Sequence, residues 1–229
     1  MEFIIIIAII IFLIILLSII YGINFKKIKE MANIKELDNI TSKYPNNKEI
    51  CKSILKKLEN EDVIIEEDEK SDMTVYVAMS NKICIGNLKN SYTRIQTIAH
   101  ECLHSIQNRK ILLFNFIFSN IYLLYFIIIF LLACFGSLPY KMTFVAILCI
   151  FSLVYYSTRM FLENDAMIKA RYLAKEYMEE NKSASQDEIN KVIKQYDILN
   201  DIGIKSVHYQ LLVNQLVKIS IICIICFIR

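Results

Sequence analysis

Four long apolar runs divide the chain, and a short turn or a longer polar segment separates each run from the next. The first three runs contain no charged residue, and about 20 consecutive apolar residues in a helix suffice to cross the ~30 Å hydrocarbon core of a bilayer. The fourth run also contains Asn214, Gln215 and Lys218, so an interfacial helix is the alternative to a span there. The pattern predicts four transmembrane helices, at residues 3–22, 111–135, 142–158 and 209–228.

The longer polar segment, residues 23–110, is predicted to fold outside the lipid as a small α+β unit. Residues 47–58 place apolar side chains at helical spacing. Residues 74–79 and 83–85 read as strands, and the polar turn between them predicts a hairpin. The acidic residues 59–72 are interpreted as a loop or a solvated edge.

The second polar segment, residues 159–206, is predicted to be helical. One helix is expected to begin near Met160. Ser185 and Glu188 have the spacing of a capping box, in which each side chain bonds to the other residue's backbone N–H. A second, shorter helix is therefore expected to start there and to end near Leu199.

Basic residues beside the apolar runs predict the side of the membrane. Lys and Arg accumulate in the cytoplasmic loops of membrane proteins. The turn between the second and third runs has only Lys141, whereas the two polar segments carry most of the flanking basic residues: Lys26, Lys27, Lys29, Arg109, Lys110 and Arg159. Both polar segments are therefore predicted to be cytoplasmic, in a multi-pass protein of the cell membrane.

Composition and charge narrow the class of protein further. A hydrophobic content of 55% and a mean hydropathy of +0.43 are too high for a disordered chain or an ordinary soluble domain. The net charge of +3 comes with no basic stripe, so nucleic acid is not expected as a partner. Seven cysteines form no regular disulfide framework, and Cys223 and Cys226 lie in an Ile-rich run, where buried thiols are expected rather than zinc or redox chemistry.

The sequence His100-Glu101-Cys102-Leu103-His104 is an H-E-x-x-H motif, within a helix predicted from an N-cap at Ser91 through Gln107. Residues four apart share one helix face, so both imidazoles can converge on one ion. Neutral imidazole suits Zn²⁺. Glu101 is placed beside a water on such an ion, where a carboxylate can act as general base.

A catalytic zinc site needs a third protein ligand, and no third histidine has a suitable position. Glu163 is the best candidate, because the predicted transmembrane hairpin leaves the membrane face near Lys110 and returns near Arg159. Asp165 is the alternative ligand, or it could orient a ligating histidine from behind. Glu163 and Asp165 could also simply begin a helix, where acidic residues favour the helix dipole.

These residues resemble the neutral zinc metallopeptidase family of bacterial membrane proteins, known as YugP-like. The resemblance covers most of the chain after the first run. It includes a strand-rich segment at residues 75–85, then Ile98-Ala99-His100-Glu101 and His104-Ser105-Ile106-Gln107, followed by two spans. It resumes at Glu163-Asn164-Asp165-Ala166, which is similar to the family's E-x-x-A-S pattern.

The resemblance implies that His100, His104 and Glu163 are zinc ligands and that Glu101 is the catalytic base. The chain differs from the family at Leu103, where the family usually has Gly. It differs again at Met167-Ile168, which replaces Ser-Arg. The implied ligand set is unaffected by these differences.

Residues outside the H-E-x-x-H motif and Glu163 give less specific indications of function. His208 or Tyr209 could donate to an oxyanion, although interfacial anchoring explains Tyr209 as well. The strand at residues 74–79 could pair with an extended substrate in addition to packing in the core. Surface or packing roles are assigned to three residues near the motif: Tyr92, Arg94 and Gln107.

Together these features predict a multi-pass α-helical membrane protein with a small α+β, zincin-like catalytic portion of the gluzincin type. The expected function is that of a membrane-bound zinc-dependent endopeptidase with one catalytic Zn²⁺. Its expected partners are membrane lipid and a peptide or protein substrate in or near the membrane. The alternatives are a catalytically silent, metal-binding membrane scaffold or chaperone, and a metal-dependent hydrolase of non-peptide amides.

Overall fold

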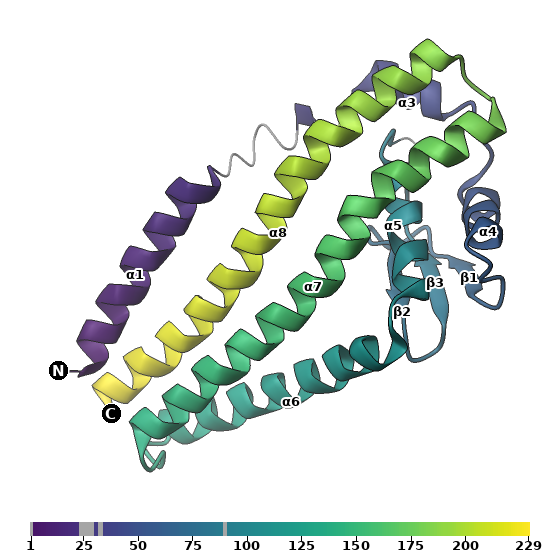
Figure 1. The fold of residues 1–229 in the computed structure, drawn as a ribbon. Helices are drawn as coiled ribbons and strands as arrows, with labels where there is room; N and C mark the ends of the chain where they lie inside the picture. Colours follow the sequence, from purple (N-terminus) through teal and green to yellow (C-terminus); the bar gives the residue numbers. More distant parts are fainter. Residues whose placement is uncertain (1, 23–29, 32–33, 89–90) are drawn as a thin grey trace. The chain divides into compact units, whose positions relative to one another are not determined.

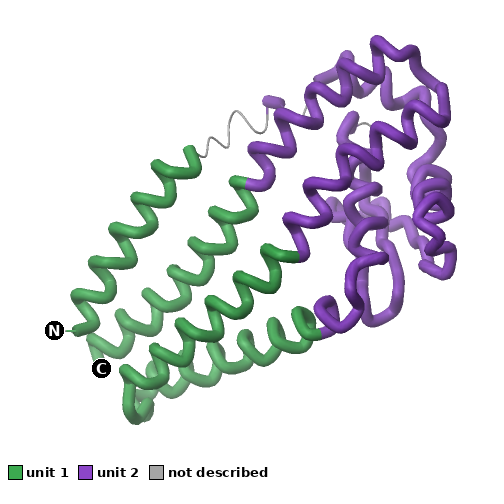
Figure 2. Tube along the Cα trace, in the orientation of Figure 1, with its two compact units in different colours: residues 1–23, 114–161, 205–229 green, residues 24–113, 162–204 purple. Residues whose placement is uncertain are grey.

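The computed structural model describes residues 2–22, 30–31, 34–88 and 91–229, which fall into two compact units. The apolar unit comprises residues 1–23, 114–161 and 205–229, and the polar unit comprises residues 24–113 and 162–204 (Figure 2). Three basic residues used to predict the membrane topology lie outside the described residues: Lys26, Lys27 and Lys29.

Four helices are long and apolar enough to cross a membrane (Figure 1). Within a bilayer core a helix satisfies every backbone N–H and C=O internally, which is why such runs fold as helices. The four expected runs match these helices, although the first two run one residue past the helix end: α1 (Glu2–Tyr21), α6 (Arg109–Cys134), α7 (Lys141–Asn181) and α8 (Gln186–Ile228).

Helix α7 continues without interruption from an apolar half into a polar half, and α8 continues from a polar half into an apolar half (Figure 1). The expected helix start near Met160 and the expected end near Leu199 are therefore wrong. No Pro occurs in either helix, and Gly203 is the only glycine in them. A change from apolar to polar side chains leaves the i→i−4 backbone hydrogen bonds intact, so composition alone does not end a helix.

The predicted capping box at the start of α8 is confirmed. The backbone N–H of Ser185 donates to Glu188 Oε2 at 3.0 Å, and the backbone N–H of Glu188 donates to Ser185 Oγ at 3.4 Å. These bonds satisfy backbone groups at the turn between α7 and α8.

The polar unit contains a three-stranded sheet in the order β1-β3-β2. The predicted hairpin is present as β2 (Val75–Val77) and β3 (Lys82–Ile85), which pair antiparallel. Strand β1 (Ile64–Glu67) pairs parallel with β3 on its other side and lies inside the acidic segment 59–72. Most of its side chains are exposed, so the acidic segment forms a solvated edge of the sheet.

Helices cover one face of this sheet and enclose the core of the polar unit. The helices against the strands are α4 (Asn47–Lys57) and α5 (Arg94–Ile106), and short α3 (Lys35–Thr41) adds buried residues to the same core. Helix α5 buries apolar residues at positions i, i+3, i+4 and i+7, the spacing of one helix face. Their side chains pack in one cluster with residues of α4 and β3: Ile95, Ile98, Ala99, Cys102, Ile54 and Ile83.

Helix α5 begins at Arg94, two residues later than an N-cap at Ser91 predicts. Thr93 occupies the N-cap position, and its side chain makes no capping hydrogen bond. Ser91 instead closes the preceding turn, because its Oγ accepts from Thr93 N–H at 3.2 Å and its carbonyl accepts from Arg94 N–H at 3.1 Å. This turn sets the start of the helix that carries the H-E-x-x-H motif.

Candidate metal centre

Two helices of the polar unit bring His100, His104 and Glu163 together. Both histidines lie on α5 and Glu163 lies on α7. The two Nε2 atoms are 3.1 Å apart, and Glu163 Oε2 lies 3.3 Å from His100 Nε2 and 3.8 Å from His104 Nε2. His104 and Glu163 are buried and His100 is partly buried. Three converging donors of these types could hold a metal ion.

Gln107 holds His104 in one orientation. Its Nε2 donates to the Leu162 carbonyl at 2.8 Å and to Asp165 Oδ2 at 3.2 Å. Because both of these partners only accept, the amide oxygen of Gln107 must face His104 Nδ1, which lies 2.8 Å away. Nδ1 therefore carries the proton in neutral His104, and Nε2 presents its lone pair to the group.

Carboxylates make this cluster attractive to a cation. Burial acts to lower the pKa of His104, but its hydrogen bond to Glu163 and the charges of Glu101 and Glu163 raise that pKa overall. The same negative charges that favour a proton on Nε2 favour a metal ion in its place. The chemistry of the donor set therefore fits a cation.

Glu101 lies beside the metal group without belonging to it. Its Oε2 accepts from the backbone N–H of Tyr76, on edge strand β2, at 2.6 Å. Its Oε1 lies 4.0 Å from His100 Nε2. Burial is the main cause that raises the pKa of Glu101 above its usual range, and the nearby histidines oppose it. Glu101 is therefore a carboxylate that is held in position and has a raised pKa, next to the three converging atoms.

Asp165, the alternative third ligand, lies outside the group of three converging atoms. It accepts from Gln107 and forms an ion pair with Lys169 at 2.5 Å. The hydrogen bond from Lys169 is the main cause that lowers the pKa of Asp165. Asp165 therefore matches the other predicted role, since it supports His104 from behind through Gln107.

The other residues weighed from the sequence have different surroundings. His208 and Tyr209 lie in the apolar unit, where His208 Nδ1 contacts Tyr156 Oη at 2.8 Å and Tyr209 Oη contacts Ser18 Oγ at 2.9 Å. Their role as oxyanion donors stays a prediction. Tyr92 is fully buried and stacks on Tyr196, which confirms a packing role.

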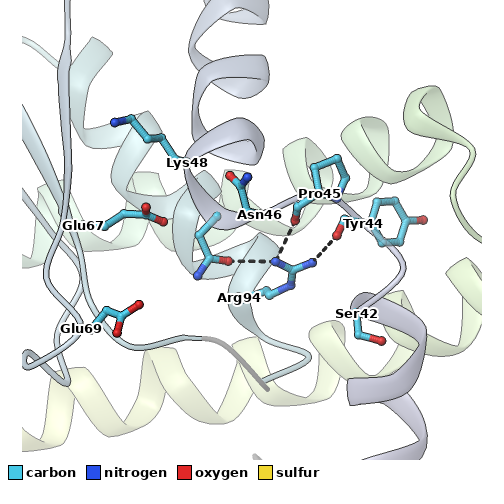
Figure 3. Close-up of a pocket in the computed structure, with 9 residues that line it drawn as sticks. Ser42, Tyr44, Pro45, Asn46, Lys48, Glu67, Glu69 and Arg94 are labelled. Atoms are coloured by element: carbon cyan, nitrogen blue, oxygen red, sulfur yellow. Dashed lines mark hydrogen bonds between the residues drawn. The ribbon is translucent and has the colours of Figure 1, made fainter.

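Arg94 is a buried structural residue next to a separate pocket of the polar unit (Figure 3). Its guanidinium donates to the carbonyl oxygens of Thr41, Tyr44 and Pro45 and to Asn47 Oδ1 at 2.7–2.9 Å. It thereby fixes the connection between α3 and α4. The pocket, of about 500 Å³, contains no residue of the metal group and is lined by Ser42, Tyr44, Pro45, Asn46, Asn47, Lys48, Glu67, Glu69 and Arg94.

Two contacts at the centre were not foreseen from the sequence. Gln107 was assigned to the surface or to packing, yet it bridges α5 and α7 behind His104. Its position three residues after His104 was a signal, because residues three apart on a helix are neighbours. The bond from Tyr76 N–H to Glu101 left no signal, since it depends on how the sheet lies against α5.

Comparisons with protein-family models, curated proteins and solved structures gave no match for this chain. The resemblance to YugP-like metallopeptidases therefore stays a prediction that depends on the motif residues.

Proposed function

We propose that the chain is a membrane-bound, zinc-dependent endopeptidase. One observation carries the proposal: His100, His104 and Glu163 place three ligand atoms within 4.8 Å of one another, with Glu101 beside them. Three protein ligands leave one position for water, which is the arrangement of catalytic rather than structural zinc sites.

The separations of the ligand atoms support zinc as the ion. Zinc bonds of 2.0–2.1 Å in a tetrahedron separate the ligand atoms by about 3.3 Å. The corresponding separations here are 3.1, 3.3 and 3.8 Å. Two imidazole nitrogens and one carboxylate oxygen are also a donor set that suits zinc. The three atoms would need to move little to coordinate one ion.

Each residue then has a distinct task. The two histidines and Glu163 hold the ion, which supplies Lewis acidity toward a carbonyl and a water. Glu101 keeps Oε2 on the amide of Tyr76, so Oε1 is the atom that receives a proton from water. Its raised pKa suits it to hold that proton and to pass it to the departing amine.

Strand β2 offers a way to position the substrate. It is an edge strand, and the N–H of Tyr76 points away from β3 toward Glu101. This N–H is already bonded to Glu101, so an extended peptide would add to this edge through the Tyr76 carbonyl and the main-chain groups at the ends of the strand. Because the chain has four helices suited to a membrane, the proposed substrate is a membrane protein or a segment close to the membrane.

Metal analysis of the purified full chain tests the ion. Wild type should bind one zinc per chain, and His100→Ala, His104→Ala and Glu163→Ala should each lose most of it. His208→Ala is the matched control, because it removes the third histidine of the chain without touching the group, and it should keep its zinc. Zinc bound equally by all four variants would contradict the site.

Cleavage assays with Glu101→Gln test the activity. This variant should keep its zinc and lose roughly 10²–10⁴-fold in the rate of cleavage of a peptide library, because the general base is gone. A zinc-bound wild type that cleaves no peptide, or that cleaves as slowly as Glu101→Gln, favours a silent metal-binding scaffold. Product analysis identifies an amidase if only non-peptide amides are hydrolysed.

A further inference from the structure

A polar pair on α8 interrupts the apolar surface of the apolar unit. Asn214 and Lys218 are four residues apart, so they lie on the same face of the helix. Asn214 is exposed and Lys218 is partly exposed on the isolated chain. In hydrocarbon, polar side chains on an open helix face are unfavourable unless another molecule satisfies them.

The ammonium group of Lys218 is deep within the apolar stretch. From Lys218 to Ile228 the helix rises about 15 Å, which is half of a ~30 Å hydrocarbon core. The start of the predicted span, at residue 209, is nine residues away in the other direction, or about 14 Å, so Lys218 lies near the middle of the span. Lys218 Nζ accordingly lies over the ring of Tyr122, 4.6 Å from its centre, instead of extending to the lipid headgroups.

No acidic residue in the described part of the chain pairs with Lys218. In sequence, Glu2 is the only Asp or Glu of the apolar unit, and it is the first residue of α1. A second copy of the chain would therefore also bring no carboxylate to the depth of Lys218.

We propose that the Asn214–Lys218 face of α8 binds a transmembrane helix of another protein that carries an Asp or Glu near its middle. The carboxylate pairs with the Lys218 ammonium, and the Asn214 amide hydrogen-bonds to the same helix. Charge complementarity and depth select this partner, since lipid headgroups do not reach the middle of a bilayer. The interaction is independent of the proposed peptidase activity.

The test uses the full chain in vesicles of zwitterionic phosphatidylcholine at about pH 8, where a model aspartate is ionised. Energy transfer is measured between a dye on the protein and a dye on a synthetic Leu/Ala helix of about 20 residues. Three helices are compared, with Asp, Asn or Leu at the centre. The Asp helix should bind wild type about tenfold more tightly than the Leu helix.

Variants assign the effect to the proposed face. Lys218→Met should bring binding of the Asp helix to the level of the Leu helix, whereas Lys218→Arg should keep the preference. Asn214→Leu should weaken binding of the Asp helix about threefold. Lys205→Met is the matched control, because it makes the same change at an exposed position of the same helix, and it should have no effect.

Several outcomes would overturn the proposal. These are equal binding of the Asp and Leu helices to wild type, a preference that survives in Lys218→Met, or Lys218-dependent transfer between two copies of the chain without peptide. If Lys218→Met fails to fold, the comparison of the three helices on wild type and on Lys218→Arg decides alone.

Discussion

The two units both bury polar side chains, but they satisfy them in different ways. In the apolar unit, Tyr122 Oη donates to Gln215 Oε1 and lies 3.1 Å from Ser152 Oγ. Donors and acceptors are matched there, and the contacts join α6, α7 and α8. In the polar unit, two imidazole nitrogens and a carboxylate oxygen point at one another.

The difference distinguishes a structural hydrogen-bond network from a binding site. A network with matched donors and acceptors needs nothing from outside. Three converging acceptors are stable together only if a proton or a metal ion lies between them. Lys218 presents the opposite case, a cation that forms no ion pair with any described residue. Unbalanced charge, more than burial, is thus the feature on which the proposed binding sites of both units depend.

The largest effect is expected from a cavity in the core of the polar unit. Ile98→Ala should lower the free energy of unfolding of that unit by about 2–5 kcal/mol, because Ile98 is fully buried on α5. Hydrogen exchange should then rise in α4 and α5 but not in residues 114–134 of α6. The control is Ile106→Ala, an exposed position on α5 that should change exchange little. Equal loss of protection in both units would contradict their separation.

Gln107→Leu should weaken metal binding by about 10–100-fold, because it removes the group that orients His104. The measurement is a competition titration with a chelator of known affinity. Gln210→Leu makes the same substitution at an exposed position of the apolar unit, and should bind metal as wild type does. Unchanged affinity in Gln107→Leu would mean that His104 does not need this support.

As the pH is lowered, metal affinity should begin to decline at a higher pH than it would if His104 had the usual pKa of a histidine. A metal needs the lone pair of His104 Nε2, so binding weakens as the pH falls through the pKa of His104 in the metal-free protein. That pKa is raised, so the decline should start above about 6.5. The measurement is the metal dissociation constant as a function of pH. A decline that starts at or below this value would contradict the raised pKa.

The smallest effect is expected in the apolar unit. Gln215→Leu should lower stability by only ~0.6 kcal/mol, the typical value for a hydrogen bond between membrane helices. Unfolding in mixed detergent micelles measures it, with the exposed Gln210→Leu on the same helix as control. A loss of several kcal/mol of stability would contradict the assignment of Gln215 to a single ordinary hydrogen bond between membrane helices.

Local patterns in the sequence predicted much of the fold. The apolar runs predicted the four long helices, and the polar turn at residues 80–82 between two strand-like segments predicted the β2–β3 hairpin. Helical spacing placed both histidines of the motif on one face, and the expected return of the chain after α6 brought Glu163 to them. These features depend on residues that are close in sequence or on a single turn.

Features that depend on tertiary contact were missed. Strand β1 lies in an acidic segment, and only its pairing with β3 makes it a strand. The continuity of α7 and α8 was hidden because a change in composition resembles a boundary. The roles of Gln107 and of the Tyr76 amide depend on the packing of α7 and β2 against α5.

The bridge made by Gln107 has a consequence for how an ion enters the site. One amide holds the ring of His104 on α5 and, at the same time, the Leu162 carbonyl and Asp165 on α7. The two helices that carry the proposed ligands are therefore already held together in the metal-free protein. Loading should be quick and should leave the circular dichroism spectrum unchanged, unlike a zinc finger, which folds only around its metal.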